Sequence, residues 1–216
     1  MHRPTREQIA ALPSYRQLPL DRIHVLRDLQ QCEAAAHELR LAGLVGFDTE
    51  SKPQFVAGGE QTGPHIVQFA TAERAFIVPT EVPDTAAFLR AMLESETVLN
   101  VGFGLASDRA LLFRKLGVKL AGTADVSRLV RRLGFTQDVG LKAAVAIVLG
   151  LRLPKSKKVT TSNWAARQLS PQQLQYAAND AHASLLVYQA VMALPPGSVG
   201  KARANQVRPQ SPSPSS

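Results

Sequence analysis

The chain has 216 residues, of which 45% are hydrophobic, and it carries a formal net charge of +8. This length and this apolar content suit a single globular domain with a full core. The single cysteine, Cys32, excludes a disulfide framework and a cysteine-based zinc site. No apolar run has the length of a signal peptide or a membrane span, so we expect a cytoplasmic protein without a membrane partner.

Positive charge is concentrated in the second half of the chain. Residues 1–108 contain 9 basic and 14 acidic residues, a net −5, whereas residues 109–216 contain 16 basic and 3 acidic residues, a net +13. This asymmetry predicts a polyanionic partner, with nucleic acid as the first candidate. A basic surface without a specific role is the alternative. The acids of the second half are Asp125, Asp138 and Asp180.

Prolines at positions 4, 13 and 19 predict an N-terminal arm over residues 1–20. A domain over residues 21–194 follows, and its apolar patterns predict both strands and helices. Strands are predicted at residues 22–25, 44–50, 65–70, 75–79 and 98–101, with a short extended piece at 122–126. Helices are predicted at residues 28–41, 84–93, 107–116, 127–133, 139–149 and 171–194. Residues 195–216 form a basic, Pro/Ser-rich segment, which is predicted to be a disordered tail.

This order of elements predicts an α/β domain with a mixed central sheet flanked by helices. The strands at 65–70 and 75–79 are joined by a short link, so they should pair antiparallel. The strand at 98–101 follows a helix, so it should lie parallel to strand 44–50 on the other side. The carboxyl end of strand 44–50 is therefore expected near the start of the helix at residue 107.

Two carboxylates, Asp48 and Glu50, lie near the end of the apolar strand 44–50. Positions two apart in a strand point to the same face, so the two acids should lie side by side. Two such acids at the end of a buried strand repel each other and are poorly hydrated, and a divalent metal ion offsets that cost directly. The alternative is an ordinary strand that ends in a polar loop.

Three further side chains are candidates for the same site. Asp108 lies in the first turn of the helix at 107–116, which the predicted topology brings towards Asp48 and Glu50. Tyr176 and Asp180 are four residues apart in the last helix and share one helix face, beside an apolar stripe. The alternative for Asp108 is an acid that only stabilises the start of its helix through the helix dipole. The alternative for Tyr176 and Asp180 is a solvated helix edge.

A basic stretch without acids precedes the last helix. This stretch, residues 152–167, holds Arg152, Lys155, Lys157, Lys158 and Arg167. It is a candidate contact for a nucleic-acid backbone, with Lys155, Lys157, Lys158 and Arg167 as the chosen residues, and the alternative is a solvated basic loop. Trp164 is the only tryptophan in the chain. It is expected to pack this loop onto the last helix rather than to stack on a base, which is the other role for such a residue.

Taken together, these motifs resemble the DEDD-type 3′–5′ exonucleases, the subclass whose last motif is Tyr-x-x-x-Asp, and within it the ribonuclease D-like branch. The resemblance covers about residues 20–194 and implies the fold of the ribonuclease H-like superfamily. A histidine five residues before the last aspartate marks the related subclass, but Gln175 stands there. The motifs that carry the resemblance are Phe47-Asp48-Thr49-Glu50, His65-Ile66-Val67-Gln68-Phe69, Ser162-Asn163-Trp164, Arg167-Gln168-Leu169 and Tyr176-Ala177-Ala178-Asn179-Asp180.

The resemblance also implies roles for the matched residues. Asp48, Glu50, Asp108 and Asp180 would hold two Mg²⁺ or Mn²⁺ ions, hard ions that favour oxygen ligands. In such two-metal sites the ions clamp the attacking and leaving oxygens of an in-line displacement. A water molecule would attack the terminal phosphodiester, and Tyr176 would orient that water, since a free tyrosine with a pKa of about 10 is a poor base. The product would be a nucleoside 5′-monophosphate.

The resulting prediction is a metal-dependent 3′–5′ exonuclease acting on single-stranded DNA or RNA ends. No helical domain of the kind that follows the ribonuclease D catalytic domain fits after Leu194, so DNA ends or short oligonucleotides remain open beside tRNA trimming. One alternative is a nucleic-acid-binding module that kept the fold without catalysis, and another is a phosphatase or phosphodiesterase for a small substrate. The preferred sugar, the preferred metal and the oligomeric state are left open.

Overall fold

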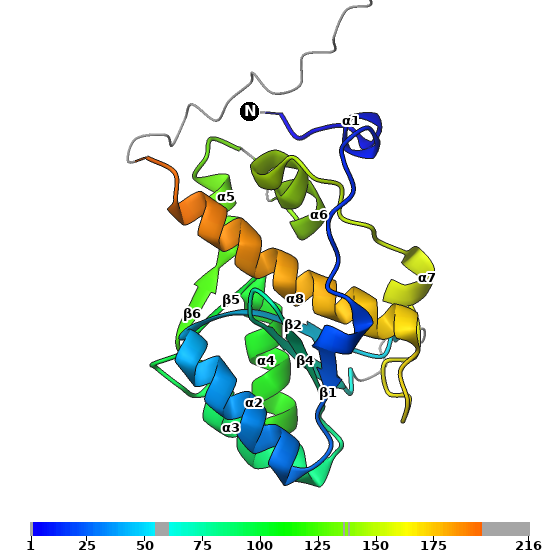
Figure 1. Cartoon of the computed structure of the whole chain (residues 1–216), viewed down its shortest axis with the longest axis vertical. Helices are drawn as coiled ribbons and strands as arrows, with labels where there is room; N and C mark the ends of the chain where they lie inside the picture. The colour runs from blue at the N-terminus through cyan, green and yellow to red at the C-terminus, as the bar shows by residue number, and fades with distance from the viewer. Residues whose placement is uncertain (1, 55–60, 136, 138, 196–216) are drawn as a thin grey trace, which may run out of the picture.

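A mixed β-sheet lies at the centre of the computed structural model, which describes residues 2–54, 61–135, 137 and 139–195 (Figure 1). Within these residues the sheet has six strands in the order β1-β4-β3-β2-β5-β6. The pairs β2–β3 and β3–β4 are antiparallel, whereas β1–β4, β2–β5 and β5–β6 are parallel. The predicted antiparallel pair and the predicted parallel neighbour of strand 44–50 are confirmed. The strands are β1 (Ile23–Val25), β2 (Leu44–Glu50), β3 (Ile66–Ala70), β4 (Ala75–Pro79), β5 (Leu99–Gly102) and β6 (Thr123–Asp125).

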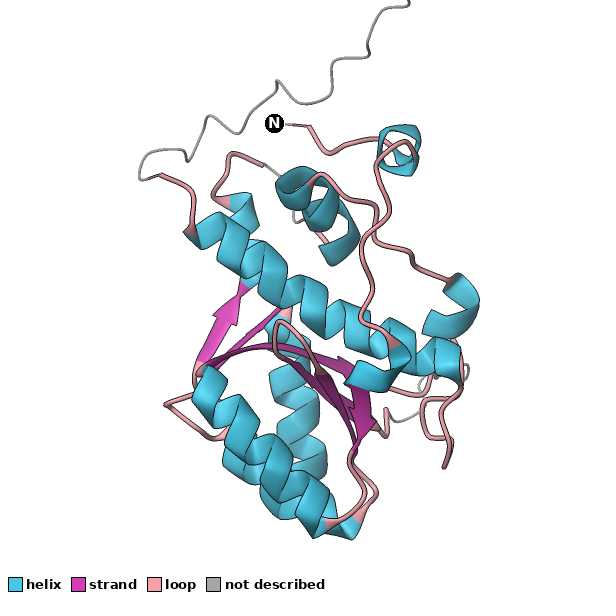
Figure 2. Cartoon of the chain, in the orientation of Figure 1, coloured by secondary structure: helices cyan, strands magenta, loops and turns pink. Residues whose placement is uncertain are grey.

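Helices cover both faces of this sheet, which confirms the predicted α/β class (Figure 2). On one face lie α2 (Leu29–Ala42), α3 (Ala86–Leu93) and α4 (Leu105–Leu116). The long helix α8 (Pro171–Met192) crosses the other face, together with α5 (Val126–Arg131) and α6 (Leu141–Ala144). Shorter elements are α1 (Arg6–Ala10), α7 (Lys157–Thr160), the 3-10 turns η1 (Leu20–Arg22) and η2 (Pro83–Thr85), and the π-helical turn η3 (Val145–Leu149).

The observed elements differ from the predicted ones in several details. Helix α4 begins at Leu105, two residues before the predicted start, because Gly104 adopts a left-handed conformation (φ 68°) that turns the chain sharply out of β5. The predicted helix at 139–149 divides into α6 and η3. One helical turn, α7, lies inside the predicted basic loop, where a single turn is too short to leave an apolar periodicity in the sequence.

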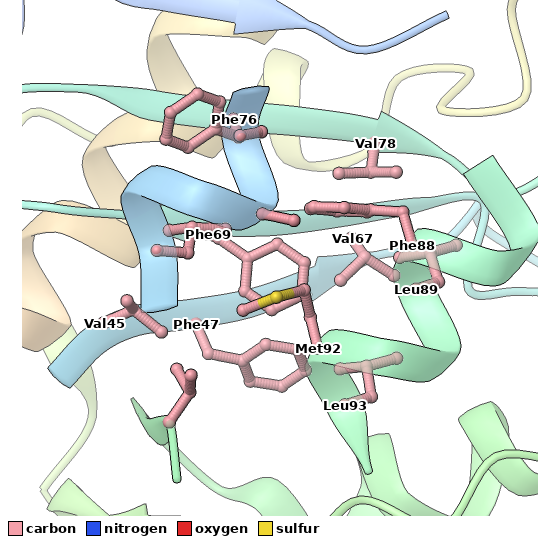
Figure 3. Packing of buried hydrophobic residues seen from close by; sticks show 14 of the residues in the cluster. Val45, Phe47, Val67, Phe69, Phe76, Val78, Phe88, Leu89, Met92 and Leu93 are labelled. Carbon is pink, nitrogen blue, oxygen red and sulfur yellow. The ribbon is translucent and has the colours of Figure 1, made fainter. Parts of the chain in front are cut away.

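The central strand β2 divides its side chains between the two layers of helices. Val45 and Phe47 are fully buried against α2 and α3, and Figure 3 shows Phe47 beside Phe69 and Met92 in this cluster. Gly46 faces α8, since a Cβ atom at this position would lie 1.9 Å from the Ala181 carbonyl oxygen. Because side chains alternate along a strand, Asp48 also lies on the α8 side of the sheet.

The close approach of β2 and α8 predicts that Gly46→Ala strongly destabilises the protein. A methyl group cannot fit against the backbone of Ala181, so the helix must shift away from the strand, at a cost of about 1–3 kcal/mol or more. Chemical denaturation measures this loss of unfolding free energy. Gly140→Ala is the matched control, because nothing lies within 4 Å of its new methyl group and only a weak N-cap preference, about 0.5 kcal/mol, is lost. Equal losses in the two variants would contradict the prediction.

Helix α8 begins as the sequence predicts. The Ser170 hydroxyl accepts from the Gln173 backbone N–H, the Gln173 side chain accepts from the Ser170 N–H, and Pro171 occupies the first turn. The N-terminal arm then packs along this helix: the Tyr15 hydroxyl donates to Nδ1 of the buried His182 at 2.6 Å, and the Gln175 amide donates to the Leu18 carbonyl oxygen at 2.7 Å. The predicted disordered tail falls on residues 196–216, outside the described residues.

Among the described residues, no helix combines the length and the hydropathy that crossing a bilayer requires.

Candidate active site

Three carboxylates meet between β2 and α8. Asp48 and Glu50 extend from the end of β2, and Asp180 extends from the middle of α8. One carboxylate oxygen of each residue lies within 4.8 Å of the others. The alternation of the strand and the close approach of α8 at Gly46 produce this cluster, which we call the acidic cluster.

Asp108 lies beside this group in the first turn of α4, and only 8% of its surface is exposed. Its Oδ1 accepts a hydrogen bond of 2.5 Å from the Thr49 hydroxyl. Thr49 lies between Asp48 and Glu50 in sequence but points to the opposite side of β2, towards α4. One face of β2 therefore lies next to Asp180 of α8, and the opposite face contacts Asp108 of α4 through Thr49. The sequence analysis did not single out Thr49, although its position between two candidate acids is a signal that could have done so.

Burial and mutual repulsion raise the pKa of these acids. For Asp48 the pKa lies well above its ordinary value, first because of burial and then because of the charges on Asp180 and Asp108. Burial, followed by the charge on Asp48, raises the pKa of Glu50 to about 9. Burial also raises the pKa of Asp108 and of Asp180. Without metal, the acidic cluster thus retains protons at neutral pH. A divalent metal ion that binds there would displace these protons.

The donor set of the acidic cluster fits a hard divalent cation. Its ligand atoms are all carboxylate oxygens, and they are close enough together to share one ion. A second observation concerns Gln68, which pairs with Asp48 across β2 and β3. Both polar atoms of its buried side chain lack a hydrogen-bond partner among the described residues. A buried amide without a partner next to a carboxylate suits a site that gains further polar groups when it is loaded.

Lys155 also lies in the acidic cluster. Its Nζ donates to Asp180 Oδ2 at 2.6 Å and to the Tyr176 hydroxyl at 3.2 Å. Burial by itself would lower the pKa of Lys155, but the charge on Asp180 and the hydrogen bond to its carboxylate raise it overall, so the ammonium group stays charged. From the sequence alone, Lys155 belongs with the other basic residues of its segment. In the structure, Lys155 is the one of the four candidate cations that bonds to Asp180 among the described residues.

Tyr176 lies between Lys155 and a fully buried tryptophan. Its hydroxyl also accepts from the Thr160 hydroxyl at 3.0 Å, and its ring packs against Trp164 with the ring centroids 5.9 Å apart. Burial, followed by the charge on Asp180, raises the pKa of Tyr176, so the phenol stays protonated at neutral pH. Trp164 Nε1 donates to the Thr160 carbonyl oxygen. The predicted packing of Trp164 is confirmed, and its full burial excludes stacking on a base.

The other predicted basic contacts lie away from the acidic cluster. Lys157 and Lys158 are exposed on the helical turn α7. Arg167 lines a separate pocket of about 410 Å³ beside Trp164 and His65, and its carbonyl oxygen accepts from Arg27. Of the three acids of the basic half, Asp180 joins the acidic cluster and Asp125 caps α5 by accepting from the Ser127 N–H. Asp138 lies outside the described residues.

A mixed sheet in this strand order, with carboxylates gathered at the end of its central strand, defines a ribonuclease H-like fold of the exonuclease type. Comparison with known families leads to the same class. The model of the 3′-5′ exonuclease family matches residues 23–193, and the chain belongs to this family. The predicted family and fold are therefore confirmed.

Individual relatives agree with this assignment. A 3′-5′ exonuclease of Arabidopsis thaliana is 31% identical over 156 residues, which cover 70% of this chain and 53% of the relative. The Nibbler EXO domain of Aedes aegypti superposes with a TM-score of 0.70 at 24% identity, covering 82% of this chain and 91% of that domain. RNase D of Trypanosoma brucei in complex with RNA U12 superposes with a TM-score of 0.69 at 19% identity. The superposition covers 87% of this chain and 65% of that RNase D chain. The chain thus spans about half the length of the Arabidopsis relative.

Proposed function

We propose that the chain is a metal-dependent 3′–5′ exonuclease that hydrolyses the terminal phosphodiester of single-stranded DNA or RNA. The observation that carries the proposal is the acidic cluster: three buried or half-buried carboxylates from β2 and α8 lie within 4.8 Å of one another in a member of the 3′-5′ exonuclease family. A fold that only bound nucleic acid would gain nothing from gathering these acids, because their charge repels phosphate.

Asp48, Glu50 and Asp180 are proposed to hold divalent ions, with Asp108 completing the set from α4. We propose Mg²⁺ or Mn²⁺, two ions for each site, because the ligands are all oxygens. When bound, these ions supply Lewis-acid stabilisation of the charge that develops on the phosphate and help to activate the attacking water. Thr49 orients the Asp108 carboxylate through its short hydrogen bond. The rigid pairing of β2 with β3 and β5 keeps Asp48 and Glu50 in register with each other.

Tyr176 is proposed to orient the attacking water rather than to remove its proton. Its raised pKa keeps the phenol protonated, and bonds from Lys155 and Thr160 hold the oxygen in place. Lys155 keeps a positive charge next to Asp180, which lowers the cost of gathering so many carboxylates. When substrate is bound, the same ammonium group lies within the site where the phosphate charge develops, and it would stabilise that charge.

We expect Tyr176→Phe to lower kcat by about 10²-fold while the protein keeps its stability, because only the hydroxyl is lost and the ring still packs on Trp164. Steady-state kinetics on a labelled oligonucleotide measure the change. Tyr188→Phe, near the far end of α8, is the matched control. A Tyr176→Phe variant as fast as the unmodified protein would exclude the proposed orienting role.

The direct test of the function uses single-stranded DNA and RNA oligonucleotides labelled at the 5′ end. Incubation with Mg²⁺ or Mn²⁺ should produce a ladder shortened from the 3′ end, with nucleoside 5′-monophosphates released, and EDTA should abolish it. The faster substrate identifies the preferred sugar. Retained binding without shortening under either metal would instead support the alternative, a binding module of this fold without catalysis.

The remaining predictions from the sequence stay predictions: the division into an arm at 1–20, a catalytic domain at 21–194 and a tail at 195–216, and the cytoplasmic location. The proposed partner is a nucleic-acid 3′ end. One structural neighbour, RNase D of Trypanosoma brucei, forms a complex with RNA U12, which supports a nucleic acid as the substrate class.

A further inference from the structure

A groove of about 890 Å³ runs along the first half of α8. One wall is the segment at residues 152–159, which leads into α7. The other wall includes Gln17 and Leu20 of the N-terminal arm, which follows α8 (Figure 1). The floor is formed by side chains of α8, including Gln172 and Asn179. We call this hollow the α8 groove.

The α8 groove is strongly basic. Lys142, Arg152, Lys155 and Lys158 line it, and its described lining contains no aspartate or glutamate. Lys142, Arg152 and Lys158 are exposed, so they can reach a ligand without leaving a protein partner buried. A groove with this charge favours a polyanion over a protein segment that carries acids and bases alike. The predicted basic tail of this same chain would be repelled from it.

The groove reaches two side chains that border the acidic cluster. Tyr176 and Lys155 line the groove, and the same two side chains bond to each other beside Asp180. A chain molecule that passes Lys155 and Tyr176 in the groove would come next to Asp180. Positive charge along the groove and negative charge at its end make an electrostatic path that ends where divalent ions would be held.

The walls of the groove favour contact with the phosphate backbone over recognition of bases. Tyr176 is the one aromatic side chain in its described lining, and it packs on Trp164. Of the lining amides, Gln17 and Gln172 are exposed, but two that could recognise base edges are already engaged: Gln173 bonds to Ser162 and Asn163, and Gln175 bonds to Leu18 and Asn179. Binding here should therefore tolerate many sequences and depend strongly on salt.

We propose that the α8 groove holds the backbone of the nucleotides on the 5′ side of the scissile phosphodiester, and that Lys142 and Arg152 contact their phosphates. This inference rests on the proposed exonuclease function and adds the path of the strand. The path runs between the arm and the segment at 152–159. Arg152 belongs to the basic stretch that the sequence offered as a backbone contact, whereas Lys142 was not a candidate from sequence.

The test compares Lys142→Glu/Arg152→Glu with Arg114→Glu, a control of the same charge type on α4, in the opposite helical layer. Two substrates are used with Mg²⁺ or Mn²⁺: a single-stranded oligonucleotide, and the nitrophenyl ester of a nucleoside 5′-monophosphate, which is too short to reach the groove. The double variant should lower the ratio of kcat/KM for the oligonucleotide to that for the ester by about tenfold or more. The control should leave this ratio within about twofold, since Arg114 lies outside the path.

Binding of a fluorescent oligonucleotide in EDTA gives a second readout that does not need catalysis. For single strands each lost phosphate contact should reduce the slope of log Kd against log salt by about 0.7. Lys142→Gln/Arg152→Gln serves if the charge-reversed variant does not fold, as judged by thermal unfolding. If the double variant has the same kcat/KM ratio and the same slope of log Kd against log salt as Arg114→Glu, the inference is overturned. A protein inactive on both substrates would refute the exonuclease proposal instead, while the binding slope still decides the path.

Discussion

Replacing Asp48 by asparagine should reduce kcat for oligonucleotide hydrolysis by about 10³-fold or more without weakening the metal-free fold. The carboxylate is lost as a ligand, and a loss of about 4 kcal/mol of transition-state stabilisation corresponds to roughly this factor. Stability behaves differently, because burial and the charges on Asp180 and Asp108 raise the pKa of Asp48 well above its ordinary value and so favour its neutral form in the metal-free protein. Asparagine resembles that neutral form in shape and charge.

The measurement pairs kinetics in Mg²⁺ or Mn²⁺ with denaturation in EDTA. Asp21→Asn is the matched control, since Asp21 is exposed on η1, away from the acidic cluster. The control should be fully active and equally stable. Activity of Asp48→Asn within a factor of about ten of the unmodified protein would contradict the proposed metal site, because a directly bound ligand contributes more than that.

The metal-free protein should lose stability as the pH rises from about 4.5 towards 9. Burial and the charge on Asp48 raise the pKa of Glu50 from 4.5 in its ordinary state to about 9. In that window the folded state therefore binds more protons than the unfolded state, so the free energy of unfolding falls with increasing pH. The cost is on the order of a few kcal/mol, which at about 2–4 °C per kcal/mol for this chain length lowers Tm by roughly 10 °C.

Mg²⁺ or Mn²⁺ should reverse this trend. The ions bind the deprotonated carboxylates, so they add most stability at the alkaline end of the window, and binding releases protons. Thermal unfolding at several pH values, with and without metal, tests both statements. The Asp48→Asn/Glu50→Gln protein should show neither the alkaline loss nor the rescue by metal. A metal-free protein that becomes more stable as the pH rises through this window would contradict the buried, proton-holding cluster.

Several features of the site follow from local sequence patterns. The alternation of β2 places Asp48 and Glu50 on one face whatever the strand packs against, because successive side chains in a strand point in opposite directions. The spacing of Tyr176 and Asp180 similarly places both on one side of α8. The start of α8 at Ser170 and Pro171 depends on the hydrogen-bonding capacity of those residues alone. Such features need no knowledge of distant parts of the chain.

Other features depend on contacts between segments that are far apart in sequence. Lys155 looked like its neighbours Lys157 and Lys158, yet it alone bonds to Asp180. Gln68 became relevant only through its register with Asp48 across β2 and β3. Nothing in the residues around these positions encodes such pairings, because a basic side chain or an amide has the same local preferences in a surface loop and beside a buried carboxylate.

The sequence by itself determined the class of fold, the order and direction of the central strands, and the face on which each acid would lie. These properties come from hydrophobic periodicity and from capping residues, which act over a few neighbouring positions. The tertiary structure alone decided the place of Lys155 in the acidic cluster and the joining of Lys142, Arg152 and the N-terminal arm along one groove. Those outcomes depend on how closely α8 packs on β2, which is set by the absence of a side chain at Gly46 and by the summed burial of residues from every layer.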